Sequence, residues 1–372
     1  MMVQIMTEPT ARPSPDLIQA NIVNTAPWER YRRPYVRDLA YVLACPTVLT
    51  KWVDFAPHEL TQAVTVHHSS FWHMQFEAYR ARLNELENTS AYQELTRYLL
   101  ARPSPNRLGF HFEGLLSFWL EDGFAKKLHP YEILASNVQL FRGKQTAGEL
   151  DLVLYNHQDS RTEHWELAIK FFMGSAPFEP INWVGINSRD NLQRKMTHMQ
   201  IKQFCALRVD TKDHGQVKID KRFAVIKGRF FFPMNCADFH YPDWLEPEFP
   251  MHRWLAASNN QGDNGNDNQY RDNQYRDNQH TQHECLAERL SDVTAFRRAH
   301  YIEWFTQRRF YNKNDNIIKA APALATLQQG LYFVKSTAQP SFNQHNTPYP
   351  NSDADYEPVV ILRTDAHAGQ TK

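Results

Sequence analysis

The chain has 372 residues, of which 42% are hydrophobic and 22% charged, and this composition predicts a globular body. Lysine plus arginine and aspartate plus glutamate both number 41, which excludes an overall basic field, so nucleic-acid binding has to come from a local patch. Four cysteines without a CxxC pair argue against a zinc ribbon or a disulfide framework, and we find neither a signal-peptide pattern nor an apolar run of about 20 residues, so we expect a soluble cytoplasmic protein with no membrane partner.

The first third of the chain has helical spacing. Residues 1–33 are proline-rich and polar, and we expect them to form a flexible arm. In residues 34–104, the stretch YVRDLAYVLACPTVL places apolar side chains at helical intervals, and Pro46 ends the pattern. A later stretch predicts one or two more helices, which break near Asn88 and end before Pro103.

Residues 105–257 have the pattern of a core made of helices and a sheet. The stretch RLGFHFEGLLSFWLEDG has a helical apolar stripe closed by Gly123. Three strand candidates follow, joined by polar links whose lengths suit hairpins, so an antiparallel meander is the economical interpretation. The candidates are residues 137–141, 149–155 and 164–172.

Beyond the meander, helical spacing returns through Leu192 and Met196, and RFAVIKGRFFF predicts a pair of strands with Gly228 near their turn. Trp119 and Trp165 are expected in the core. Together these elements predict an α+β fold, α/β/α-like, with a helical N-terminal region and a mixed sheet that begins antiparallel and is flanked by helices.

The rest of the chain divides by composition. Residues 258–283 nearly repeat the unit RDNQY and hold few apolar side chains, so they predict a disordered insertion rich in Asn and Gln. Residues 284–337 predict a C-terminal region of helix and strand, in which ERLSDVTAFRRAHYIEWFTQRRF is expected to be helical. Residues 338–372 are rich in Pro, Asn and Ser and predict a flexible tail.

Charged residues interrupt the second and third strand candidates in a regular way. Side chains alternate between the two faces of a strand, so Glu149 and Asp151 share one face, as do Glu166, Ala168 and Lys170. If the two strands pair, their polar faces lie side by side and form an acidic cluster with a lysine at its edge.

Such a cluster suits a divalent cation. Carboxylates held about 4–6 Å apart repel unless a cation lies between them, and Mg²⁺ prefers oxygen ligands. A metal held by Asp151 and Glu166 could polarise a phosphodiester, while Lys170 could stabilise the developing charge or orient the attacking water. The alternative interpretation is a solvated sheet face, because any half-exposed strand alternates charged and apolar residues.

Several stretches resemble a known superfamily. GELDLVL resembles the Gly-Glu-x-Asp strand of PD-(D/E)XK nucleases, HWELAIKFF resembles their Glu/Lys strand, and LGFHFEGLL resembles their first core helix. In this order and after VRDLAYVLACPTVL, the same blocks resemble the bacterial domain of unknown function 1853 family, which is placed in that superfamily. The nuclease-like core covers residues 108–233, and the narrower resemblance covers most of the chain except the insertion.

The resemblance implies a role for individual residues. Asp151 matches the metal-binding aspartate and Lys170 the catalytic lysine, while Glu113 matches the acid of the helix and Glu149 the glutamate that precedes the aspartate. It implies Mg²⁺- or Mn²⁺-dependent hydrolysis of phosphodiester bonds in nucleic acid, with DNA as the expected partner.

One position departs from the superfamily pattern. The second acid usually stands two residues before the lysine, where this chain has Ala168, and the available acid is Glu166. Its carboxylate lies on the same face but one strand repeat, roughly 6.6 Å, farther along. Either Glu166 reaches the metal, with Glu113 or Glu149 filling the vacant place, or the chain is a catalytically inactive nuclease-fold module that binds nucleic acid or a protein partner.

Two further segments are basic. In the stretch RDNLQRKMTHMQIKQ, next to the proposed site, four cations are candidates for contacts to a nucleic-acid backbone: Arg189, Arg194, Lys195 and Lys202. Basic and aromatic residues also interleave in FRRAHYIEWFTQRRFYNK, which suits either a base-stacking surface or an amphipathic helix with its aromatic side chains in the core. His164 lies on the face of Glu166 and could join the site, but we interpret it as a surface histidine.

Overall fold

The computed structural model describes eleven segments of the chain, and every structural statement below concerns these residues. The segments are 26–55, 61–105, 107–142, 145–187, 189–233, 240–257, 293–299, 301–306, 317–319, 328–336 and 357–363. The predicted insertion at 258–283 lies outside them, as does most of the predicted N-terminal arm and much of the predicted tail.

The N-terminal part is helical, as predicted. Pro34 fits the first turn of α2, where a missing N–H costs nothing, and α3 and α4 separate at the extended residue Thr89, close to the predicted break. Gly123 does not close its helix, α5, but lies inside it, and the His129 ring packs where a Cβ of this residue would project. The helices are η1 (Pro27–Arg30), α2 (Pro34–Ala44), α3 (Ser69–Asn88), α4 (Tyr92–Leu100) and α5 (Leu108–Ala125).

The end of the predicted flexible arm is packed rather than flexible. Tyr31 is buried, and the backbone N–H groups of Arg32 and Arg33 donate to the Glu87 carboxylate on α3. Sequence composition did not show this, because the anchoring acid lies more than fifty residues away along the chain.

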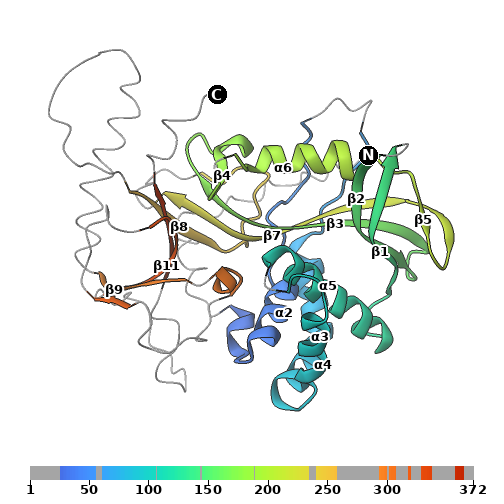
Figure 1. The fold of residues 1–372 in the computed structure, drawn as a ribbon, viewed down its shortest axis with the longest axis horizontal. Helices are drawn as coiled ribbons and strands as arrows, with labels where there is room; N and C mark the ends of the chain where they lie inside the picture. The colour runs from blue at the N-terminus through green and yellow to red at the C-terminus, as the bar shows by residue number, and fades with distance from the viewer. Residues whose placement is uncertain are drawn as a thin grey trace, which may run out of the picture.

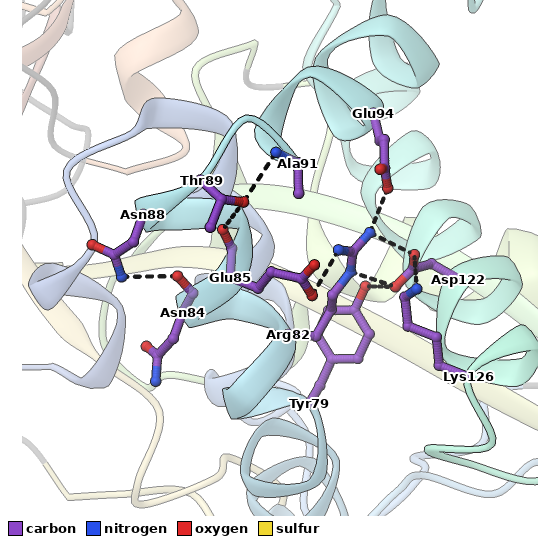
Figure 2. A network of polar contacts seen from close by, with 10 residues as sticks. All are labelled: Tyr79, Arg82, Asn84, Glu85, Asn88, Thr89, Ala91, Glu94, Asp122 and Lys126. Carbon is purple, nitrogen blue, oxygen red and sulfur yellow. Dashed lines mark hydrogen bonds and ion pairs between the residues drawn. The ribbon is translucent and has the colours of Figure 1, made fainter.

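A cluster of charges holds α3, α4 and α5 together; we call it the Arg82 cluster (Figure 2). The buried Arg82 guanidinium lies 2.9 Å from Asp122 Oδ1 and 2.5 Å from Glu94 Oε2, and it also pairs with Glu85. The Tyr79 hydroxyl donates to Asp122 Oδ2 at 2.5 Å. Burial alone would lower the pKa of the guanidinium, but hydrogen bonds to its three acids raise it above its ordinary value.

One large mixed sheet organises the fold, with the order β1-β2-β3-β7-β8-β12-β11-β9-β10 and β4 beside β3. The predicted antiparallel meander is confirmed in β1, β2 and β3, after which β7, β8 and β12 continue in parallel. The strands are β1 (Tyr131–Arg142), β2 (Gln145–Asn156), β3 (Arg161–Gly174), β4 (Trp183–Gly185), β7 (Lys221–Pro233), β8 (Met251–Ala257), β9 (Val293–Arg298), β10 (Ile317–Lys319), β11 (Gly330–Ser336) and β12 (Glu357–Arg363), and a separate hairpin pairs β5 (Arg208–Thr211) with β6 (Gly215–Lys218).

Helices cover both faces of this sheet. Helices α2 to α5 lie on one side and α6 (Leu192–His198) on the other, where a π-helical turn, η4 (Met199–Gln203), extends it (Figure 1). The predicted mixed fold of helices and a sheet is therefore confirmed. The main core includes the two tryptophans expected there, Trp119 and Trp165, whose ring centroids lie 6.4 Å apart.

The predicted strand pair around Gly228 is wrong, because β7 is one continuous strand. Gly228 has φ +133° and lies very close to β3: a Cβ there would lie 1.8 Å from the Lys170 carbonyl oxygen. The glycine therefore marks a close approach of two paired strands and not a turn.

The C-terminal segments also differ from the prediction. Val293–Arg298 lies within the stretch expected to be helical but forms β9, because it pairs with β10 and β11. Residues 357–363 fall in the predicted flexible tail but form β12, whose buried residues Val359, Val360 and Ile361 fill the sheet between β8 and β11. Non-local pairing, which a sequence window does not contain, decides both segments. None of the helices described has the length and apolarity needed to span a membrane.

Candidate functional site

The candidate site is a gap along one edge of β3. Its other edge pairs with β7 continuously from Glu163 to Met173. The edge at the site pairs with β2 as far as Trp165 and with β4 from Phe172 onward. Along this edge, between β2 and β4, no strand of the described segments pairs with residues 166–171. We call this region, with the side chains around it, the carboxylate gap.

Asp151 lies where β2 leaves β3. Its Oδ2 accepts a hydrogen bond from the Leu167 backbone N–H at 2.7 Å. The side chain thus takes the place of a backbone carbonyl of β2, which no longer pairs with β3 here. Leu152 joins the main core while Leu150 packs with the β5–β6 hairpin, although strict alternation along a strand would place both on one face.

Glu166 is almost fully buried at the same place. Gln203 on η4 donates to Glu166 Oε1, but Oε2 has no hydrogen-bond partner in the described segments. The nearby His164 Nε2 lies 3.4 Å from Oε2, too far for a strong hydrogen bond. His164 is itself buried, which corrects the expectation of a surface histidine, and burial lowers its pKa to about 3, so the ring is neutral.

The carboxyl groups of the gap are held where ionisation is costly. Burial, and then the facing Glu166, raise the pKa of Asp151 to about 8. Burial also raises the pKa of Glu166 to about 7, against the opposing effect of Lys195. Glu113 approaches from α5, and burial together with the Asp151 charge raises its pKa to about 7. The structure thus brings together three of the four predicted acids.

The fourth acid, Glu149, lies at the margin. It is opposite Gln139 on β1, is half-buried, and reaches the group only as a charge that helps to raise the pKa of Glu113.

Two lysines border the gap in different ways. Lys170 Nζ lies 2.6 Å from Asp190 Oδ2, just before the N-cap of α6. Lys195 on α6 faces Glu166 and Asp151, yet its ammonium has no hydrogen-bond or ion-pair partner among the residues described. Burial lowers the pKa of Lys195, while the two acids act in the opposite direction.

A pocket of about 1090 Å³ opens onto the gap. Glu113, Lys170 and Lys195 line one side, and Arg297 and Arg298 of β9 line the other. Arg297 is paired with Glu303 at 2.8 Å, and Arg298 donates to the Gln329 carbonyl at 3.1 Å. The basic stretch at 297–304 therefore reaches the site as a strand and a 3-10 helix, η5 (Tyr301–Trp304), and not as the predicted helix face.

A chain of buried hydrogen bonds holds the segment that follows Arg297 and Arg298 against the helices. Asp38 of α2 lies 2.7 Å from the His111 Nε2 of α5 and accepts from the Thr306 hydroxyl at 2.6 Å. All three side chains are buried, so the segment after η5 is tied to the helical layer.

Three other predicted nucleic-acid contacts lie outside the pocket lining. Arg189 and Arg194 are exposed near the start of α6, where Arg194 donates to the Arg189 carbonyl at 3.0 Å. Lys202 is exposed on η4. Lys195 is the one member of the predicted contact set that turns into the gap.

Sequence reasoning missed two polar residues at the gap. Asp190 precedes the N-cap Asn191, a position that suggests a helix start but not a partner for Lys170. Gln203 reaches Glu166 because the helix widens into a π turn at Met199, and nothing in the local pattern signals that turn.

The donor set can be compared with what a divalent cation needs. Within the described segments, no group of three or more His, Cys, Asp or Glu side chains is arranged to hold a metal. Mg²⁺, however, commonly keeps several waters and uses one or two carboxylates. Asp151 and Glu166 supply two carboxyl groups, one with an unpartnered buried oxygen, so the gap fits a largely hydrated cation rather than a closed protein cage.

Comparison with known proteins gives one match. Residues 37–321 match the family described as "Domain of unknown function (DUF1853)". Neither the curated proteins nor the solved structures gave a match.

Proposed function

Given that the chain belongs to the DUF1853 family, we propose that it is a metal-dependent nuclease of the PD-(D/E)XK type that hydrolyses phosphodiester bonds in nucleic acid, with DNA as the substrate. The carrying observation is the facing pair of carboxyl groups, half-buried Asp151 and buried Glu166, next to a pocket bordered by cations and lined by Leu167 and Ala168. The order of helix acid, strand aspartate and strand glutamate with lysine supports the superfamily assignment.

The cost of this arrangement supports a functional role. Buried acids with raised pKa values and an unpartnered oxygen destabilise a fold, and such groups gather at sites where they bind or react. A plain solvated sheet face, the alternative interpretation of the sequence, would leave these carboxylates in water.

Asp151 and Glu166 would hold Mg²⁺ or Mn²⁺, with Glu113 nearby and Glu149 at the margin. A bound cation would act as a Lewis acid and lower the pKa of water. In the reaction, a water oxygen bonds to phosphorus and one P–O ester bond breaks, giving a phosphomonoester and a free hydroxyl; the displaced protons pass to the leaving oxygen and to solvent. The lysines bordering the gap would offset the negative charge that develops on the phosphoryl oxygens.

A second candidate is an inactive module that keeps the fold and binds nucleic acid or a protein partner. It is favoured by Ala168 at the usual acid position and by Lys170, whose ammonium is already paired with Asp190. The two candidates differ in whether metal binding leads to bond cleavage.

Metal-dependent thermal unfolding tests the proposal. We expect Mn²⁺ at a hundredfold excess over its Kd to stabilise the wild type by about 2.7 kcal/mol, and Asp151→Asn or Glu166→Gln to lose most of this gain. Glu246→Gln is the matched control, because it removes a buried acid whose charged neighbours are Glu248 and His68 and not residues of the gap.

Cleavage of linear, nicked and branched DNA by the same proteins then separates the candidates. A Mn²⁺ shift without cleavage would support the binding module, and no shift in the wild type would remove the nuclease.

A further inference from the structure

We infer that Lys195, and not Lys170, is the lysine that contacts the scissile phosphate, and that Lys170 is a positioning residue. This inference rests on the proposed nuclease function and names the residue that stabilises the negative charge on the phosphoryl oxygens. The two lysines lie on different elements, Lys170 on β3 and Lys195 on α6, and both line the pocket.

The first observation is the difference in partners. The Lys170 ammonium is 2.6 Å from the Asp190 carboxylate, so its charge is already neutralised and held to one side. Among the residues described, nothing pairs with the Lys195 ammonium, although it faces Glu166 and Asp151. An unpaired cation beside two carboxyl groups has its donors available for a phosphoryl oxygen.

The second observation is what Lys170 holds. Asp190 donates its backbone N–H to the Asn187 carbonyl, and its own carbonyl accepts from the Gly185 N–H at 2.7 Å, which fixes the turn between β4 and α6. The next residue, Asn191, caps α6 by accepting from the Arg194 N–H. The Lys170–Asp190 pair therefore ties β3 to the start of the helix that carries Lys195.

The third observation is the position of the two acids. Glu166 precedes Lys170 by four residues on β3, and both it and Asp151 interact electrostatically with Lys195 across the gap. Asp151, Glu166 and Lys195 thus form one electrostatic group, of which Lys195 lines the pocket, while Lys170 and Asp190 form a second pair that also lines it.

Single-turnover cleavage of a labelled DNA duplex in Mn²⁺ tests this assignment. We expect Lys195→Met to lower the rate by roughly 100- to 1,000-fold, as for loss of one preorganised transition-state donor, and Lys195→Arg to restore part of it. Lys170→Met and Asp190→Asn should each lower it by only about tenfold, and the double variant should be no slower than either, since both break one pair. Lys218→Met, an exposed lysine on β6, is the control and should cleave as the wild type does.

Mn²⁺ affinity gives a readout that does not require turnover. Removing the Lys195 charge should lower the Kd for Mn²⁺ by roughly tenfold, because a like charge no longer opposes the cation, while Lys170→Met should leave the Kd unchanged. Circular dichroism checks that each variant is folded.

The outcomes separate the two claims. A wild type that cleaves DNA, with Lys195→Met cleaving equally well or Lys170→Met losing as much as Lys195→Met, would overturn the assignment alone. A wild type that neither binds Mn²⁺ nor cleaves would overturn the proposed function and this inference with it.

Discussion

The Arg82 cluster and the carboxylate gap each contain a buried charged side chain, Arg82 in one and Glu166 in the other, and the two regions differ in how that side chain is paired. In the Arg82 cluster, one buried cation meets three acids and a tyrosine hydroxyl completes the set (Figure 2). In the gap, buried Glu166 faces half-buried Asp151, an oxygen of Glu166 is unpartnered, and Lys195 is close but unbonded within the described segments.

The difference shows what each region does. Complete pairing offsets the desolvation cost and ties three helices together, so the Arg82 cluster is structural. Incomplete pairing leaves free energy available for a ligand, which is the condition of a binding or catalytic site. The same residue types therefore mark different roles, and partner geometry, not charge itself, distinguishes them.

The largest expected effect is on the free energy of unfolding, when the central arginine of the Arg82 cluster is replaced. Arg82→Met leaves the carboxylate of Asp122 without its main partner, and we expect it to lower the free energy of unfolding by about 3–5 kcal/mol. Arg80→Met, which removes a half-exposed arginine paired with Glu77 on the same helix, should change it by less than about 1 kcal/mol. Urea unfolding measures both; equal effects would mean that the buried pairing contributes nothing special.

An identical substitution in the two regions sharpens the comparison. At pH 8.5, Asp122→Asn should destabilise the protein by about 1–3 kcal/mol, because it weakens the bonds to Arg82 and Tyr79. Asp151→Asn should stabilise the metal-free protein by roughly the same amount, because it removes a charge that burial disfavours. A destabilising Asp151→Asn would show that this acid is structural.

The stabilising effect of Asp151→Asn should depend on pH. The ordinary pKa of an aspartate is 3.8, and burial raises that of Asp151 to about 8. Between these values the folded state holds a proton that the unfolded chain has lost, so wild-type stability falls as pH rises through this range.

The advantage of Asp151→Asn should therefore be near zero at pH 4 and complete above pH 8. His67 and His111, whose pKa values burial lowers to about 3 and 4, destabilise both proteins in acid and cancel from the difference. Paired urea titrations across pH would contradict the idea if the two curves stayed parallel.

Local patterns in the sequence were enough for the helices of residues 34–125 and for the β1–β3 meander, since apolar spacing and short polar links determine those elements. They failed at Val293–Arg298 and at residues 357–363, whose strands exist because distant strands pair with them. Gly228 was predicted to lie near a turn but instead marks a close approach of the paired strands β3 and β7.

The candidate site was predictable in its residue types but not in its pairing. The positions of Asp151 and Glu166 follow from two adjacent strands, and the sequence places them there. That β2 and β3 part at those two residues, and that Lys170 is held by Asp190, depends on β4 and α6, which approach from elsewhere in the chain. This is why Lys195 was expected among surface contacts and not inside the gap.

The smallest expected effect concerns that holding pair. Lys170 and Asp190 remain partly exposed, so a double-mutant cycle of Lys170→Met and Asp190→Asn should give a coupling energy in stability of about 0.5–1 kcal/mol. The more exposed pair Lys51–Asp243 should give nearly zero in the same experiment. A pair that contributes so little to folding but changes DNA cleavage in both single variants would act through the position of α6, whereas a coupling of several kcal/mol would place it with the Arg82 cluster as part of the framework.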